Sequence, residues 1–392
     1  MSEAFIVAAQ RTAGGRRNGR LSGWHPVDLA ARVIDALVDQ TGIDPAAVED
    51  VIMGCVSQAG EQSTNVARNA VLASRLPESV PATSLDRQCG SSQQALHFAA
   101  QAVMSGTMDC VIASGVESMS RVPMFTPSEL PRKAGLGEYT SPGIKARYKD
   151  VVFSQFAGAE MMACKYDLSK ETLDRYALES HLRAIAATRE GRFTKEILQV
   201  EARRADGAAA DEMHSVDEGI RFEATLESIA NVKVLQEGGV ITAANASQIC
   251  DGATGVMVVS ARALKMFNLK PLARVHHMSV LGHDPVIMLE APIPATEIAL
   301  KKAGLKMADI DAYEVNEAFA PVPLAWAKAL GADPALLNVN GGAIALGHPL
   351  GASGTKLMTT LIHVLEQRGG RYGLQTMCEG GGMANVTIIE RL

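Results

Sequence analysis

The chain has 392 residues, of which 47% are apolar and 20% are charged, and its formal net charge is -6. This length allows two domains with sizeable cores, and the acidic balance argues against nucleic acid as a partner. No apolar run is long enough to cross a membrane, and the first residues do not resemble a signal peptide. The six cysteines are not closely paired in the sequence, which excludes a CxxC metal site and a secreted disulfide framework. We therefore expect a cytoplasmic protein that binds no metal ion.

The first part of the chain alternates expected strands with expected helices, which predicts parallel strand pairing and an α/β fold. The expected strands cover residues 5–9, 51–55, a short stretch near 83, and 110–114, and the expected helices cover 26–41, 64–76 and 93–104. Later strands are expected at 255–260, 310–315, 372–377 and 384–389, and later helices at 170–190, 318–330 and 357–365.

An internal repeat organises these elements. Residues 42–54 resemble residues 304–316, and the two stretches begin 262 residues apart. The same spacing places Cys89 opposite Gly351, so two equivalent loops precede two equivalent helices. The repeat predicts two pseudo-symmetric α/β halves, residues 1–118 with 251–270 and residues 271–392. Residues 119–250 are then an inserted loop domain that forms a lid or a binding wall.

The two equivalent loops carry a candidate nucleophile and a candidate base. Cys89 directly precedes an expected helix, where the positive end of the helix dipole lowers the pKa of a thiol. His348 lies in a glycine-rich loop, and glycine lets the main chain approach a ligand closely. Because the loops are equivalent, we expect the two side chains to face each other. The other cysteines of the first half and the insertion are interpreted as small buried hydrophobes: Cys55, Cys110 and Cys164.

Two further positions accompany them. Cys378 precedes three glycines and lacks a helix dipole, so we interpret it as a proton carrier, and the N–H groups of residues 380–382 are expected to face a developing oxyanion. Asn316 ends an expected strand and either binds a water molecule, orients the histidine or caps the following helix. The chain has no GxGxxG sequence after the first strand and no Walker sequence, which argues against a nucleotide cofactor.

Together these loops resemble the signatures of the thiolases, the acyl-CoA acetyltransferases. The resemblance covers the whole chain, and the matching residues are Asp-Arg-Gln-Cys-Gly-Ser-Ser at 86–92, Gly-Val-Glu-Ser-Met-Ser at 115–120, Asn-Glu-Ala-Phe-Ala at 316–320, Asn-Gly-Gly-Ala-Ile-Ala-Leu-Gly-His-Pro-Leu-Gly-Ala-Ser-Gly at 340–354 and Cys-Glu-Gly-Gly-Gly at 378–382. It implies a thiolase-like fold of two α/β halves with an inserted loop domain.

The resemblance also implies a role for each loop. His348 takes the proton of Cys89, whose thiolate attacks the 3-oxo group of an acyl-CoA, and Cys378 protonates the released acetyl-CoA enolate or removes a proton in the reverse condensation. One oxyanion is assigned to His348 with a water held by Asn316. The other is assigned to the N–H groups of Cys89 and Gly380.

For the substrate, the resemblance implies acyl-CoA and coenzyme A, with no permanently bound cofactor. The residues that it assigns to CoA are Arg221, Ser228 and Ser247, together with Ala318 and Phe319 along the pantetheine tunnel. The family implies a homodimer or homotetramer, and residues 127–148 are a candidate for tetramer contacts.

The chain departs from the family pattern near the acyl pocket. Short-chain members carry a His-Met pair where this chain has Ser-Gln-Phe at 154–156, and after Ser247 this chain has Gln248 for the usual glycine and Cys250 for the usual asparagine. These differences favour a bulky 3-oxoacyl group, such as a branched, cyclic or steroid-derived one.

Three other functions fit part of the pattern. A β-ketoacyl synthase-type condensing enzyme shares the doubled fold, but it normally pairs its cysteine with two histidines or with a histidine and an asparagine. A catalytically silent lipid-binding protein of this fold would be free to lose Cys89, His348 or Cys378. A cysteine hydrolase would not need a second thiol.

Overall fold

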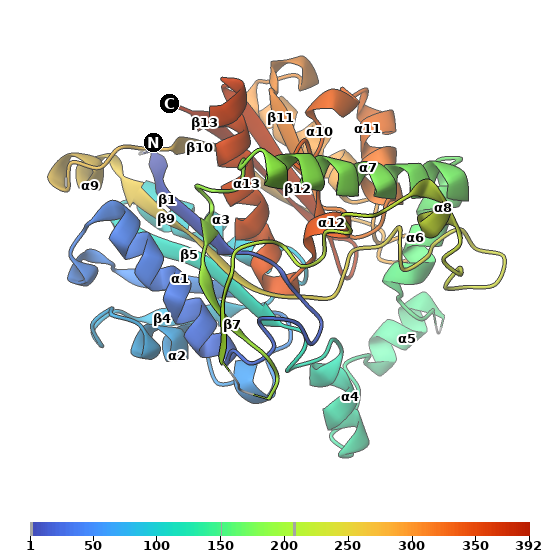
Figure 1. Ribbon diagram of the computed structural model, residues 1–392, viewed down its shortest axis with the longest axis horizontal. Helices are drawn as coiled ribbons and strands as arrows, with labels where there is room; N and C mark the ends of the chain where they lie inside the picture. Colours follow the sequence, from blue (N-terminus) through green and yellow to red (C-terminus); the bar gives the residue numbers. More distant parts are fainter. Residues whose placement is uncertain (1–2, 150, 207–208) are drawn as a thin grey trace.

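The computed structural model describes residues 3–149, 151–206 and 209–392, and one large mixed β-sheet runs through it (Figure 1). Its strands are β1 Ala4–Thr12, β2 Gly15–Arg16, β3 Asp50–Gly54, β4 Ala82–Leu85, β5 Cys110–Ser118, β6 Ile197–Leu198, β9 Cys250–Ser260, β10 Ala273–Gly282, β11 Ala312–Val315, β12 Tyr372–Glu379 and β13 Met383–Arg391. They follow the order β11-β12-β13-β10-β1-β9-β5-β3-β4, with β2 paired to β9 and β6 paired to β1.

The two ends of this sheet repeat one arrangement. In the first half β3 and β5 are parallel, and β9 lies antiparallel between β5 and β1. In the second half β11 and β12 are parallel, and β13 lies antiparallel between β12 and β10. Strands β3 and β11 start at residues 50 and 312, and β5 and β12 start at 110 and 372, so each pair is 262 residues apart. The predicted repeat and the thiolase-like α/β fold are therefore confirmed.

The helices repeat in the same way. Both α1 (Pro26–Thr41) and α10 (Pro292–Ala303) begin at a proline, which needs no N–H partner there, and both end before a left-handed residue, Gly42 with φ 67° and Gly304 with φ 70°. The loops that carry Cys89 and His348 lead into α3 (Ser91–Met104) and α13 (Ser353–Arg368). Helix α13 is four residues longer at its start than the sequence pattern predicted.

Helices α3 and α13 form an inner layer between the two halves of the sheet. Their buried side chains share one hydrophobic core with residues of β1, β5, β9 and β10. The outer faces are covered by α1 and α2 (Val66–Ala73) on the first half, and by α10 and α11 (Pro321–Leu330) on the second. Because the inner helices start side by side, the loops before them meet in the middle of the molecule.

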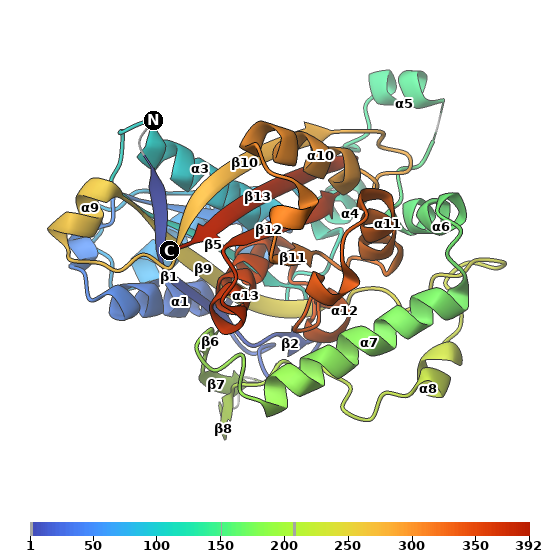
Figure 2. The ribbon, with the colours of Figure 1, turned by 90° about the horizontal axis from the view of Figure 1, so that it is seen from above.

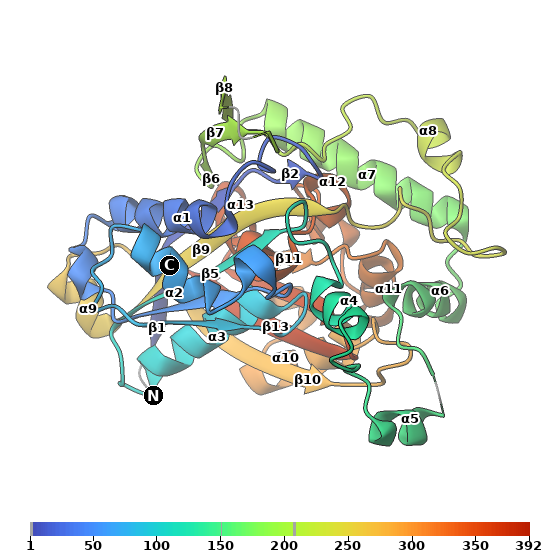
Figure 3. The same ribbon diagram turned by 90° about the horizontal axis from the view of Figure 1, so that it is seen from below.

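The segment between β5 and β9 leaves the sheet and returns to it only at β6, which pairs with β1. Its other elements are α4 (Thr126–Lys133), α5 (Pro142–Tyr148), α6 (Gln155–Lys165), α7 (Lys170–Arg189), β7 (Val200–Arg203), β8 (Ala209–His214) and α8 (Leu226–Ala230). Helices α6 and α7 share the core of the second half, and Figure 2 shows α7 running past α12 (Ala343–Leu346). Helices α4 and α5 project from the body in Figure 1, and Figure 3 shows α5 at the edge of the molecule from below. The exact domain boundaries at residues 118, 250 and 270 stay a prediction.

Short elements complete the chain: α9 lies at Ala261–Met266, and 3-10 turns lie at Pro45–Ala47, Gly60–Gln62, Met307–Asp309, Pro334–Leu336 and Leu350–Ala352. Within the described ranges, no helix is both long enough and apolar enough to cross a membrane.

The inner layer predicts where stability is concentrated. Leu361 of α13 is fully buried, and Gly373 of β12 lies directly against it, so Leu361→Ala leaves a cavity that the neighbouring sheet cannot fill. We expect a loss of about 2–5 kcal/mol in the free energy of unfolding, measured by urea denaturation. Leu72→Ala is the matched control, because Leu72 is 55% exposed. Equal losses for the two variants would contradict the inner-layer assignment.

Candidate functional site

A tight turn presents Cys89 at the start of α3. Gln88 has a left-handed conformation, with φ 50°, and its carbonyl accepts hydrogen bonds from the Ser91 N–H at 3.0 Å and the Ser91 hydroxyl at 2.6 Å. The Ser91 hydroxyl in turn accepts the Arg87 N–H at 2.9 Å. These bonds fix the main chain on both sides of Cys89, whose side chain is half-buried. The thiol is therefore held at a loop-to-helix junction, as the sequence predicted.

The His348 loop packs directly against this turn. The Thr355 N–H donates to the Ser92 hydroxyl at 3.0 Å, and a Cβ added at Gly354 would lie 2.0 Å from the Gln93 nitrogen. Only glycine allows this close approach of two main chains. The two reactive loops therefore meet, as their equivalence predicted. Among the described residues, Cys89 makes no hydrogen bond to His348 itself.

The hydrogen bonds of His348 indicate its tautomer. Its Nδ1 lies 2.5 Å from the Ser353 hydroxyl, which donates its one proton to the Pro349 carbonyl at 2.8 Å. Nδ1 must then be the donor to Ser353, which leaves a lone pair on Nε2. The Asn316 amide nitrogen lies 3.3 Å from this Nε2 and donates to it. The imidazole is thus held as a neutral base whose Nε2 lone pair accepts the long bond from Asn316, and that bond has to give way when Nε2 takes a proton.

Asn316 orients the histidine and does not cap the following helix. Helix α11 begins at Pro321, and its N-terminal cap is Ala320 without a side-chain bond. The side-chain amide oxygen of Asn316 is buried and makes no hydrogen bond to any described residue. A buried amide oxygen of this kind normally binds a partner. This free acceptor fits the water molecule that the sequence analysis assigned to Asn316, and that role stays a prediction.

Cys378 and Gly380 reach the same place from the end of β12. Cys378 is buried, and the residues that follow the two cysteines are in contact, since a Cβ added at Gly90 would lie 1.9 Å from a Glu379 oxygen. A Cβ on Gly380 would lie 2.9 Å from the Gln88 side-chain oxygen, which puts Gly380 against the Cys89 turn. The Gly380 N–H makes no hydrogen bond to a described residue, and the Cys89 N–H faces its own sulfur. Two such donors beside a thiol are suited to an oxyanion.

The electrostatics of the free site differ from the sequence prediction. Burial, with a contribution from the nearby Glu379, raises the pKa of the Cys89 thiol to about 12, and this is opposite to the expected lowering by the α3 dipole. Burial and then the charge of Lys356 lower the pKa of His348 to about 3. Burial, Cys89 and Glu379 raise the pKa of Cys378 well above its usual value. The resting site is therefore a neutral thiol beside a neutral imidazole.

Glu379 was not singled out by the sequence analysis, although it lies in the Cys378 signature. Its carboxylate is fully buried, and neither oxygen makes a hydrogen bond to a described residue. It fills the space at Gly90, where an added Cβ would lie 1.9 Å from a Glu379 oxygen. Burial raises the pKa of Glu379 to about 8, although Arg87 and the Asn385 N–H act to lower it. At neutral pH this acid is mostly protonated and places little negative charge beside Cys89.

Two other buried carboxylates hold the loops together and were also missed as functional residues. Glu117 accepts the N–H groups of Val56 at 2.9 Å, Ser57 at 3.0 Å and Gly351 at 2.8 Å, so it links the first half to the His348 loop. Glu317 accepts the Ile344 N–H at 3.1 Å and the Ser180 hydroxyl of α7 at 2.7 Å. Both residues stand in recognisable sequence signatures, but only their contacts reveal what they do.

The CoA candidates fall into two groups. Ser247, Ala318 and Phe319 lie together, because the Ser247 N–H donates to the Ala318 carbonyl at 2.9 Å and Ala246 forms a β-bridge with Phe319. Arg221 and Ser228 lie on the surface of the insertion. The Ser228 hydroxyl closes a capping box with Thr225 at the start of α8, so its side chain already has a structural role.

An aromatic pair, Phe156 and Phe319, lies beside these CoA candidates and forms what we call the aromatic wall. Phe156 of α6 packs edge-on against Phe319, with ring centroids 5.5 Å apart, and the neighbouring Gln155 contacts the sulfur of Met124. Ser154 caps α6 and does not enter this wall. Gln248 turns to the loops, where its amide nitrogen donates to the Gly219 and Ile344 carbonyls at 2.8 and 2.7 Å.

The remaining cysteines were interpreted partly correctly. Cys55 and Cys110 are buried as predicted, but Cys164 is exposed on α6, because it lies on the face of that helix turned away from the core. In the part of the chain that the structure describes, no group of three or more His, Cys, Asp or Glu residues is placed to hold a metal ion.

Comparison with known proteins identifies the same regions. Residues 4–262 match the family model of the thiolase N-terminal domain, and residues 269–391 match that of the thiolase C-terminal domain. The chain is 54% identical to the steroid 3-ketoacyl-CoA thiolase FadA6 of Mycobacterium tuberculosis, over all of this chain and 95% of that protein. It is 41% identical to a 3-ketoacyl-CoA thiolase of Erwinia tasmaniensis over the whole of both chains.

Solved structures agree with these relatives. Human mitochondrial 3-ketoacyl-CoA thiolase superposes with a TM-score of 0.89 and 36% identity, covering all of this chain and 99% of that one. A second structure of the human enzyme, in complex with CoA, gives the same TM-score and identity and is covered over 98% of its length.

The raised pKa values predict how Cys89 reacts in the free protein. Alkylation by iodoacetamide should be slow at pH 7 and rise with pH, by about tenfold per unit at most, because only the thiolate reacts. Between pH 7 and pH 9 the rise should be shallower, since Glu379 ionises there and its charge disfavours the thiolate. Glu379→Gln should make the rise steeper, whereas Glu171→Gln on the exposed face of α7 should not.

The measurement is mass spectrometry of the Cys89 peptide, which separates this thiol from the exposed Cys164. Full reactivity of Cys89 already at pH 7 would contradict the neutral resting state. Identical pH profiles for the wild type and Glu379→Gln would contradict the role of the carboxyl group.

Proposed function

Because this chain belongs to the thiolase family, we propose that it cleaves a 3-oxoacyl-CoA with CoA, giving acetyl-CoA and a shortened acyl-CoA through an acyl group on Cys89. The protein is an acyltransferase of the thiolase type. The observation that supports the proposed steps most directly is the meeting of three loops, which brings two thiols and the His348–Asn316 pair to one place.

The first half-reaction acylates Cys89. His348 Nε2 takes the thiol proton as the sulfur attacks the 3-oxo carbon, and the free N–H groups of Cys89 and Gly380 face the oxyanion that forms. The carbon–carbon bond then breaks, and the electron pair goes to the acetyl-CoA enolate, which Cys378 protonates. His348, with a water held by Asn316, stabilises the enolate oxygen.

The second half-reaction restores the enzyme. The proton held by His348 first passes to the Cys378 thiolate, so both groups return to their resting state. A CoA thiol then gives its proton to His348 and attacks the thioester carbonyl, and Cys89 leaves as a thiolate and takes that proton back. Since the resting pair is neutral, the ionic form of Cys89 has to arise together with attack, while the oxyanion donors are engaged. We assign Arg221 and Ser228 to the outer part of CoA, and Ser247, Ala318 and Phe319 to the pantetheine.

We propose a bulky acyl group, such as a cyclic or steroid-derived one. The relative at 54% identity is named a steroid 3-ketoacyl-CoA thiolase, and the relative at 41% identity is named without a steroid. The His-Met pair of short-chain members is replaced here, and the aromatic wall of Phe156 and Phe319 is open to solvent at Phe156, which is 39% exposed. A partly open apolar wall is suited to a large hydrophobic substrate.

We further propose a cytoplasmic homodimer or homotetramer. The segment of α4 and α5 projects from the body and exposes apolar residues: Leu130 in α4, and Leu136 and Tyr139 in the connection between the two helices. An exposed apolar surface of this kind is typical of a contact between subunits.

The substrate proposal is tested with a panel of 3-oxoacyl-CoAs, from acetoacetyl-CoA to a steroid-derived thioester, assayed with CoA for the appearance of acetyl-CoA. We expect a specificity constant at least about tenfold higher for the bulky substrates, because they fill more of the apolar wall. Cys89→Ala is the control and should abolish cleavage. Comparable constants across the whole panel would exclude a preference for bulky substrates.

The assignment of Cys378 is tested by separating the two chemical steps. Cys378→Ala should lower thiolysis by about a hundredfold or more, because the enolate loses its proton donor. The same variant should still exchange labelled CoA into a simple acyl-CoA, since that exchange needs only Cys89 and His348. Loss of both reactions would argue against a separate proton carrier. Unchanged thiolysis would show that Cys378 is not the proton donor to the enolate.

A further inference from the structure

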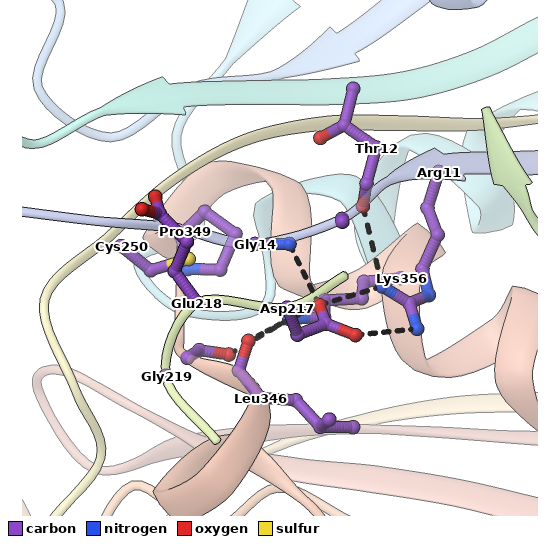
Figure 4. Close-up of polar contacts among 12 residues, drawn as sticks. Arg11, Thr12, Gly14, Asp217, Glu218, Gly219, Cys250, Leu346, Pro349 and Lys356 are labelled. Atoms are coloured by element: carbon purple, nitrogen blue, oxygen red, sulfur yellow. Dashed lines mark hydrogen bonds and ion pairs between the residues drawn. The ribbon is translucent and has the colours of Figure 1, made fainter. Parts of the chain in front are cut away.

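Lys356 is a buried lysine that touches the main chain entering His348. It lies in the first turns of α13, and its side-chain nitrogen donates to the Leu346 carbonyl at 2.5 Å and the Gly347 carbonyl at 3.1 Å (Figure 4). These are the two residues before the catalytic histidine. A buried ammonium is costly unless it is paired and hydrogen-bonded, so its presence here needs a counter-charge.

Asp217 of the inserted segment supplies that counter-charge. One of its oxygens lies 3.9 Å from the Lys356 nitrogen. The same carboxylate accepts two bonds from Arg11 at 2.9 and 3.1 Å, and the Gly14 N–H at 2.7 Å. Despite its burial, the charges of Arg11 and Lys356 hold the pKa of Asp217 below its usual value. Arg11 is also paired with the buried Glu196 at 2.6 Å, so the cluster holds two positive and two negative groups.

The inserted segment also touches the His348 loop directly. A Cβ added at Gly219 would lie 2.5 Å from the Ala345 carbonyl, so the two main chains are in contact. The side-chain nitrogen of Gln248 donates to the Gly219 and Ile344 carbonyls. The main-chain carbonyl of Gln248 accepts the His348 N–H at 3.0 Å. Gly219 lies two residues from Asp217 and two residues from Arg221, the candidate CoA contact.

We propose that Lys356 is a positioning residue that fixes the main chain before His348 and, through Asp217, joins this loop to the inserted segment that carries Arg221. The catalytic part of this proposal rests on the proposed function of His348. Neither the repeat nor the signatures assign such a role to a lysine. The replaced positions Gln248 and Cys250 belong to the same contact, since Cys250 packs on Gly347 and near Gly14.

The charge of Lys356 gives the proposal a specific signature. Burial is the largest cause that lowers the pKa of His348, and the charge of Lys356 is the second; together they bring this pKa to about 3. The neutral groups Asn316 and Ser353 contact the imidazole. The charged or titratable groups around Lys356 are Asp217, Arg11, Glu196 and Cys250. Removing the lysine charge therefore raises the pKa of His348, and the acid side of the pH–rate profile should move to higher pH.

The kinetic test compares Lys356→Met, which removes the charge and both bonds, with Lys356→Arg and Lys356→Gln. For Lys356→Met we expect kcat to fall on the order of tenfold to a hundredfold, because a histidine displaced by a fraction of an ångström loses its alignment. KM for CoA should rise by less than the fall in kcat, since Lys356 reaches the Arg221 segment only through Asp217 and no CoA contact is itself removed. Lys356→Gln should shift the acid limb of the profile upward, and Lys356→Arg should restore it.

Lys195→Met is the matched control. Lys195 is exposed and forms an ion pair with Glu366 of α13, the helix that also carries Lys356. Substitution of Lys195 should change neither kcat nor the pH–rate profile. The proposal is overturned if Lys356→Met keeps the wild-type kcat and acid limb. If Lys356→Met does not fold, Lys356→Gln decides the point, and an unshifted acid limb in that variant overturns the proposal.

A second measurement does not depend on the reaction. Hydrogen–deuterium exchange, followed by mass spectrometry, should show faster exchange in peptides covering residues 338–352 and 214–222 of Lys356→Met or Lys356→Gln, with the rest of the chain unchanged. Unchanged exchange in these two peptides overturns the positioning role even if the enzyme is active. Absence of thiolysis in the wild type would instead reject the proposed function, and the exchange result would still decide whether Lys356 holds the loop.

Discussion

The site depends on the pairing of main-chain groups in a buried loop that holds only the short helix α12 and one 3-10 turn. Residues around His348 lie in the interior, where an unpaired N–H or carbonyl is costly, so side chains from other segments must pair with them. Glu317 and Glu117 accept main-chain N–H groups on either side of the loop. Lys356 donates to two main-chain carbonyls of the loop, and the side-chain nitrogen of Gln248 donates to a third. Each of these partners comes from a different part of the chain. The loop therefore adopts its shape only when both halves and the insertion are assembled.

The same burial determines the charge state of the reactive groups. Removing the thiol and the imidazole from water disfavours their charged forms, and this effect exceeds the attraction of the α3 dipole for a thiolate. The thiol of the free protein is thus neutral. In the mechanism that we propose, activation comes from the substrate, whose developing oxyanion faces the N–H groups of Cys89 and Gly380. In this arrangement the protonated Glu379 avoids an opposing charge beside the nucleophile.

The doubled architecture explains why the reactive groups come from distant segments. The equivalent helices α3 and α13 start side by side in the inner layer, so the loops before them have to meet. The end of β12, equivalent to the end of β5, contributes the second thiol. The insertion breaks the symmetry of the two halves. It adds the aromatic contact of Phe156 with Phe319 on one side of the site and the Asp217 contact with Lys356 on the other.

The sequence alone determined the fold class, the repeat and the three reactive loops, because periodicity, a constant spacing of 262 residues and glycine-rich signatures are local properties of the chain. It also placed Asn316 at a strand end, but left open whether it caps a helix. Only the tertiary structure decided that question, the direction of the Cys89 pKa shift, and the roles of Glu117, Glu317 and Lys356. The physical reason is the same in each case. Desolvation and the pairing of buried charges depend on which distant segments come together, and no local pattern records that.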